Sequence, residues 1–183
     1  MVERERIVTG AETKPRDRIL GLASSGIHSN GFSLARKVFF ERLRLRVGDP
    51  IPGVGRSVAD ELLEPTRIYV KSVLPVLDAA RIVAMTHVTG GGITENLPRV
   101  LPDGTRAFID RASWPVPPVF AAIRAGGGVD EAEMRRTFNM GIGFLVVAPP
   151  DGADRAAAML RAAGERVFEI GEIRAGLRGV EYV

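Results

Sequence analysis

Residues 24–31 form a short segment of serine, glycine and asparagine whose composition suits the binding of an anion. An apolar run precedes this segment and an amphipathic run follows it, so we expect a turn between a strand and a helix. Small residues let a ligand approach the backbone, and the free N–H groups and dipole of a following helix favour negative charge. His28 could donate, accept or transfer a proton near neutral pH. The other residues that we expect to bind a ligand here are Ser25, Gly26, Ser29, Asn30 and Gly31.

This first segment differs from the two best-known phosphate-binding motifs. It has no Gly-Lys-Ser/Thr ending, so it is not a Walker A loop, and it lacks the Gly-x-Gly-x-x-Gly fingerprint of dinucleotide-binding folds. A tight strand-to-helix turn that only caps the helix is therefore the alternative to an anion site.

A second turn, residues 89–92, reads Thr-Gly-Gly-Gly and again separates a predicted strand from a predicted helix. Each glycine costs about 0.5–1 kcal/mol relative to alanine in regular structure, and a turn that needs one positive φ does not need three glycines. Close approach of a phosphate or ribose would explain the run, and a crowded turn is the alternative. We interpret the neighbouring His87 as a hydrogen-bonded core residue. The expected ligand-binding residues are Thr89, Gly90, Gly91, Gly92 and Asn96.

A third turn, residues 139–143, reads Asn-Met-Gly-Ile-Gly and leads into the apolar run 142–148. Glycines at the entrance of a strand often mark close packing or a bulge. Asn139 and Gly141 are therefore candidates for ligand contact, and close packing is an equally good explanation of the glycines.

The elements that must hold these turns alternate between short apolar runs and amphipathic segments, which favours an α/β or α+β domain over a bundle or a sandwich. Ser57, Asp130 and Asp151 are expected N-caps, and Pro75 should kink or end its helix. The predicted strands are 18–23, 82–88, 106–110, 142–148, 166–170 and 179–183, and residues 5–9 could form another. The predicted helices are 32–45, 57–64, 67–80, 92–99, 119–125, 130–135 and 153–163.

The composition bounds the function classes. A chain of 183 residues suits about one domain, and 45% hydrophobic with 26% charged residues is ordinary for a globular protein. The absence of cysteine excludes disulfides and thiolate zinc sites, and two histidines make a transition-metal site unexpected. A net charge of +3 without basic runs between aromatics does not indicate nucleic-acid binding. Without a long apolar stretch or a signal-peptide pattern, we expect a soluble, cytoplasmic protein that does not enter a membrane.

Together, the three turns resemble one protein family in their order and spacing. The first reads Ser-Ser-Gly-Ile-His-Ser-Asn-Gly, the second His-Val-Thr-Gly-Gly-Gly followed by Glu-Asn-Leu-Pro-Arg, and the third Thr-Phe-Asn-Met-Gly-Ile-Gly. All three are similar to segments of the phosphoribosylformylglycinamidine cyclo-ligases, also called aminoimidazole ribonucleotide synthetases. The likeness covers residues 5–183, and residues 64–71 and 113–115 match as well.

The resemblance implies an α+β fold with a mixed β-sheet packed with helices, the C-terminal domain of the aminoimidazole ribonucleotide synthetase superfamily. Family members are about twice as long, and their N-terminal domain binds ATP and metal and forms a homodimer. We therefore expect residues 1–183 to be a single substrate-side domain without that half, as an expressed domain, a cleavage product or a split-gene subunit. Alone, it should be inactive.

The resemblance also implies a reaction of purine synthesis. ATP and magnesium, held mainly by the N-terminal domain, activate the formyl oxygen of formylglycinamidine ribonucleotide, and an amidine nitrogen attacks that carbon to close the imidazole ring. The His28 turn and the triple glycine should hold the ribose phosphate and the glycinamidine end, with His28 as a candidate proton-transfer group. The alternatives are a phosphometabolite-binding module without turnover, an inert half-protein, or the equivalent domain of selenophosphate synthetase, thiamine-phosphate kinase or another superfamily member.

Overall fold

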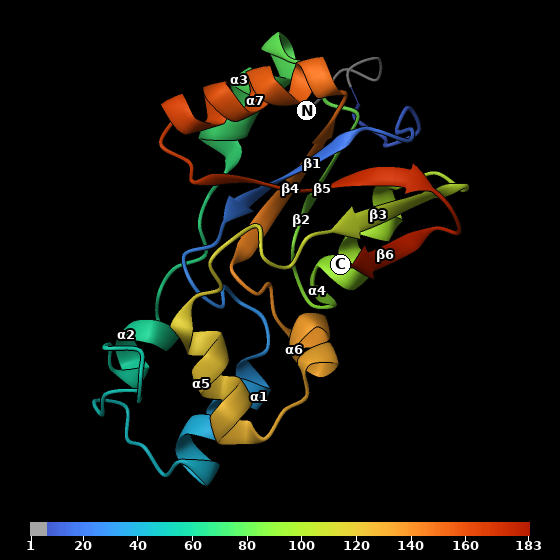
Figure 1. The fold of residues 1–183 in the computed structure, drawn as a ribbon. Coiled ribbons are helices and arrows are strands. Elements are labelled where there is room, and N and C mark those ends of the chain that lie inside the picture. Colours follow the sequence, from blue (N-terminus) through green and yellow to red (C-terminus); the bar gives the residue numbers. More distant parts are fainter. Residues whose placement is uncertain (1–6) are drawn as a thin grey trace.

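The computed structural model describes residues 7–183, which build a curled six-stranded sheet in the order β2-β4-β1-β5-β3-β6 (Figure 1). Neighbouring strands run antiparallel except β3 and β6, which are parallel, so the sheet is mixed as predicted. The strands are β1 (Arg18–Ala23), β2 (Ala84–His87), β3 (Thr105–Ile109), β4 (Ile142–Ala148), β5 (Val167–Ala175) and β6 (Gly179–Tyr182). The predicted fold class, an α+β domain with a mixed sheet, is confirmed.

The helices form two groups around the sheet. In Figure 1, α3 and α7 lie together along one face, and α1, α2 and α5 gather at the opposite end of the molecule. The α-helices are α1 (Phe32–Arg36), α2 (Val58–Leu62), α3 (Val70–Ala79), α4 (Gly92–Asn96), α5 (Pro118–Gly127), α6 (Glu131–Thr137) and α7 (Pro150–Ala162). A π-helix, η2 (Lys37–Arg42), continues α1, and a 3-10 helix, η3 (Leu97–Val100), continues α4.

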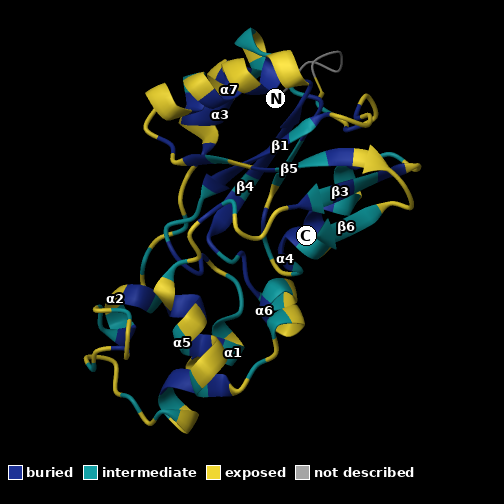
Figure 2. Cartoon of the chain, viewed as in Figure 1, coloured by how far each residue is buried: buried dark blue, intermediate teal, exposed yellow. Residues whose placement is uncertain are grey.

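The apolar core has three parts, which follow from this arrangement (Figure 2). Strand β1 is central and alternates its side chains between two of them: Ile19 joins the part on the α4 side, and Leu20 and Leu22 join the part under α3 and α7. The third part lies between the helices α1, η2, α5 and α6, where Phe39 and Phe120 are fully buried. The candidate turns connect the sheet to this helical part.

Several predicted boundaries need correction. The predicted helix 32–45 ends as a π-helix at Arg42, and α3 starts at Val70 and continues through Pro75. Ser57 and Asp130 cap their helices as predicted, but the cap prediction for Asp151 is wrong because α7 already begins at Pro150. Of the predicted strand 5–9, residues 5–6 lie outside the described part and residues 7–9 form no strand. Among residues 7–183, no helix has the length and apolar character to cross a bilayer.

Candidate functional site

The three candidate turns meet at one end of the sheet. The Ser24 N–H donates to the Gly141 carbonyl (2.9 Å), and the Asn139 side-chain N–H donates to the Gly26 carbonyl (2.9 Å). Asn30 lies beside the triple glycine, since a Cβ placed on Gly90 would be 3.9 Å from the Asn30 side-chain oxygen. The first turn therefore contacts both of the others, although more than 50 residues separate them in sequence.

Asn139 holds the first and third turns together. Its side-chain oxygen accepts hydrogen bonds from the Gly141 N–H (2.7 Å) and the Ser24 hydroxyl (3.2 Å), in addition to the bond that its amide donates to Gly26. The side chain is fully buried. An amide engaged on both sides and closed off from solvent positions backbone. We therefore assign Asn139 to the support of the site.

Asn96 has the same relation to the second turn. Its amide donates to the carbonyls of Gly92 (2.8 Å) and Gly90 (3.1 Å), and its oxygen accepts from the Thr89 hydroxyl (3.0 Å). Asn96 is buried as well. The side chains of Thr89 and Asn96 therefore fix the shape of the glycine turn.

Two of the three glycines are explained by packing. Gly91 has φ +97°, and its N–H donates to the Arg136 carbonyl (2.8 Å). Gly92 has φ +58°, and an added Cβ would collide with the Arg135 carbonyl oxygen of α6. Gly90, by contrast, is exposed and meets only Asn30. The crowded-turn explanation therefore accounts for Gly91 and Gly92, and Gly90 is the glycine at which a ligand can approach the backbone.

The helices that follow the turns give little support to a dipole argument. Both α1 and α4 contain five residues before the geometry changes to a π-helix or a 3-10 helix. Gly31, at the start of α1, packs against the Phe138 ring, and Gly141 packs against Pro117. Gly31 and Gly141 thus have packing roles, and the expectation that a helix N-terminus attracts an anion finds no support here.

His28 is buried beneath the first turn, and its environment keeps it neutral. Its Nε2 accepts a hydrogen bond from the Ser25 N–H (3.1 Å), and burial, with smaller contributions from His87 and Arg67, lowers the pKa of His28 to about 4. A neutral ring whose Nε2 accepts carries its proton on Nδ1. Nδ1 is buried without a hydrogen-bond partner among the described residues. The ring is therefore suited to donate from Nδ1 and poorly suited to act as a base at neutral pH.

An aromatic cluster surrounds His28. The ring centroids of His28, Tyr69 and His87 lie 6.1–6.3 Å from one another, and Phe144 lies 5.4 Å from Tyr69. Gly143 makes room for the cluster, because any side chain there would overlap Tyr69 and His28. His87 is exposed, so its interpretation as a core residue is wrong. Its strand, β2, lies at the edge of the sheet, which leaves the last residue open to solvent.

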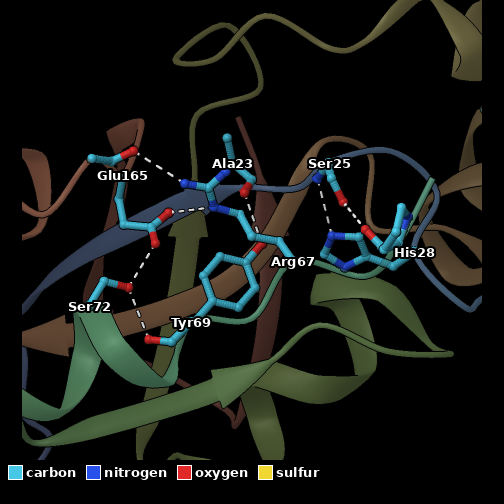
Figure 3. Close-up of polar contacts among 9 residues, drawn as sticks. Ala23, Ser25, His28, Arg67, Tyr69, Ser72 and Glu165 are labelled. Carbon is cyan, nitrogen blue, oxygen red and sulfur yellow. Dashed lines mark hydrogen bonds and ion pairs between the residues drawn. The ribbon is translucent and has the colours of Figure 1, made fainter.

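A polar network behind the first turn was not predicted from the sequence (Figure 3). Arg67 Nε donates to the buried carboxylate of Glu165 (2.7 Å), whose other oxygen lies 2.7 Å from the Ser72 hydroxyl. The Tyr69 hydroxyl donates to the Ala23 carbonyl at the end of β1 (2.8 Å). The network fixes the start of α3 against the sheet. Nothing around Glu165 in the sequence signals its burial.

The segment before α3 is also tied to the first turn. The Ser25 hydroxyl donates to the Pro65 carbonyl (2.6 Å), and the Ser29 and Thr66 hydroxyls form a hydrogen bond of 3.0 Å. Of the predicted site residues, Ser29 and Gly90 are exposed and Asn30 is partly exposed. With His87, they form a polar opening that can donate and accept hydrogen bonds.

A mixed six-stranded sheet whose glycine-rich turns meet at one end defines an α+β domain with a polar candidate site at that end. Residues 14–183 match the family described as AIR synthase related protein, C-terminal domain, and the chain belongs to this family. Its sequence is 47% identical over 183 residues to the phosphoribosylformylglycinamidine cyclo-ligase of Geotalea daltonii and 48% identical over 174 residues to that of Chromobacterium violaceum. The matches cover 100% and 95% of this chain but 53% and 50% of the relatives, so the chain spans about half their length.

Solved structures share the fold at low sequence identity. Thiamine-monophosphate kinase from Stenotrophomonas maltophilia superposes with a TM-score of 0.66 and 17% identity, over 99% of this chain and 54% of the kinase chain. T. maritima PurL complexed with AMPPCP gives a TM-score of 0.55 and 14% identity, over 95% of this chain and 24% of that chain. At these identities the likeness concerns the fold alone.

Proposed function

We propose that this chain is the substrate-side half of an ATP-dependent cyclo-ligase that converts formylglycinamidine ribonucleotide to aminoimidazole ribonucleotide in purine synthesis. In this reaction ATP phosphorylates the formyl oxygen, an amidine nitrogen attacks the same carbon, and the oxygen leaves as phosphate. The main support is the 47% identity over the whole chain to a cyclo-ligase. The meeting of the three resemblance-bearing turns at one site agrees with it.

The exposed residues of the site would contact the substrate. Ser29 and Asn30 offer a hydroxyl and an amide, and Gly90 lets the ribose phosphate come close to the backbone. Asn96 and Asn139 would act by shaping the turns, because their amides are already engaged. His28 would hold the Ser25 backbone through Nε2 and offer its Nδ1 proton, a role that needs no change of protonation at neutral pH.

ATP and Mg²⁺ would come mainly from the other half of the enzyme. Within residues 7–183, no three histidine or acidic side chains gather in a way that could hold a metal ion. The described residues therefore do not fit a resident metal, and no step of the reaction is assigned to one here. The partner that we propose is the N-terminal ATP-binding domain, which in the full-length protein would also form the homodimer.

Reconstitution tests the proposal. The chain is mixed with the N-terminal half of the Geotalea daltonii cyclo-ligase, and ADP formation that depends on formylglycinamidine ribonucleotide is followed, with each half alone as control. We expect activity in the mixture only, and a loss of about tenfold or more in kcat/KM for Asn30→Ala, the size of one strong hydrogen bond. ADP formation without dependence on this substrate, or none from a stable complex of both halves, would refute the cyclo-ligase proposal in favour of a binding module.

A further inference from the structure

The segment from the end of α2 to the middle of α3, residues 63–74, presents an exposed apolar side. Of the nine large hydrophobic side chains that are exposed among residues 7–183, four lie within these twelve residues. Single exposed hydrophobics are ordinary, but such a concentration marks a contact surface. The four, here called the 63–74 patch, are Leu63 (77% exposed), Ile68 (78%), Val70 (58%) and Leu74 (57%).

The other side of the same segment is firmly attached to the domain. Val73 and Val76 are buried in the core under α3, and Tyr69 and Arg67 are hydrogen-bonded to Ala23 and Glu165. On α3, Val70 and Leu74 are four residues apart and therefore share a face. The patch is thus held out on a fixed support, which lowers the entropic cost of docking against it.

The patch adjoins the candidate site. Pro65 and Thr66, between its first two members, are the residues that accept the hydrogen bond from Ser25 and pair with Ser29. A partner seated on the patch would therefore lie next to the first turn, where the substrate is proposed to bind. This continuity distinguishes the patch from Val47 and Leu177, which are exposed singly.

We infer that the 63–74 patch is the docking surface for the ATP-binding half of the enzyme. The inference rests on the proposed function, which needs ATP to reach this site, and the described residues provide no metal-holding cluster of their own. The relatives are about twice as long as this chain, so a domain of comparable size remains to be placed. A second copy of this chain on the patch would bring no ATP-binding residues to the site.

Binding between the separate halves tests the inference independently of catalysis. The affinity of this chain for the N-terminal half of the Geotalea daltonii cyclo-ligase is measured by titration calorimetry for the wild type, Ile68→Asp and Leu74→Asp. A carboxylate placed in an apolar interface should weaken binding about tenfold or more. Leu177→Asp, at a site of 85% exposure on the β5–β6 turn, is the matched control and should bind as the wild type does. Circular dichroism verifies that each variant is folded.

Three results would overturn the inference: equal affinities for Ile68→Asp and Leu177→Asp, no association of the wild-type halves at about 100 µM, or self-association of this chain that Ile68→Asp abolishes. The last would identify a second copy as the occupant. Patch-sensitive binding without substrate-dependent ADP formation would sink the proposed function alone. Activity with patch-insensitive binding would sink the docking surface alone.

Discussion

Acidification should destabilise this protein through His28. The pKa of His28 is about 4 in the folded state against an ordinary value of 6.5, because the buried ring resists protonation. The unfolded chain therefore binds the proton more readily between these two values, and stability falls as the pH drops through 6.5 and levels off below 4. The shift corresponds to a loss of about 2 kcal/mol at pH 5 and about 3 kcal/mol at the limit.

Urea unfolding of the wild type and of His28→Asn at pH 7.5 and pH 5.0 isolates this contribution. Asparagine tolerates the left-handed backbone that His28 adopts, with φ +54°, and cannot be protonated in this range. Burial raises the pKa values of Asp17 and Glu61, which acts in the opposite direction but cancels between the two proteins. We expect the wild type to lose about 2 kcal/mol more than the variant. His87→Asn, which retains His28, should keep the loss. Parallel pH dependence of the wild type and His28→Asn would refute the reasoning.

Three further predictions concern the support of the site. Glu165→Gln should lower the free energy of unfolding by about 1–3 kcal/mol, since it weakens a buried, charge-assisted bond, whereas Glu172→Gln, in an exposed ion pair, should change it by less than about 0.5 kcal/mol in the same urea titrations. Gly92→Ala should lower the thermal midpoint strongly through its collision with α6, and Gly90→Ala should leave it unchanged; equal effects would contradict the packing assignment. Asn139→Ala should cost about 2–4 kcal/mol in chemical unfolding because it leaves buried backbone groups unpaired, and a near-neutral result would show that the amide is dispensable.

The sequence predicts the central strands to the residue and the edges less well. Strands β1 and β4 are uninterrupted apolar runs because both of their faces are covered, and their bounds agree with the prediction. Strand β2 lies at the edge and is shorter than predicted, and no local pattern reveals that His87 at its end faces solvent. The start of α3 at Val70 follows contacts that Arg67 and Tyr69 make with distant residues, so it escapes any local pattern.

The candidate site divides in the same way. Spacing and residue type pick out all three turns, and the structure brings them together. They do not reveal that Asn96 and Asn139 use their amides on backbone carbonyls, because a polar side chain beside glycines fits ligand binding and turn support equally well. Only the folded arrangement separates Gly90, which is open, from Gly91 and Gly92, which are packed.

The central place of β1 has a consequence for biosynthesis. Both partners of β1 come from the end of the chain: Ala23 pairs with Ile142 in β4, and Leu22 pairs with Val167 in β5. At about 5–20 residues per second, a ribosome needs roughly 10–30 s to make the intervening polypeptide. During that time the apolar run of β1 has no strand on either side. The nascent chain therefore depends on late-emerging residues to close its sheet, and a chaperone that holds the early segment should raise the folded yield.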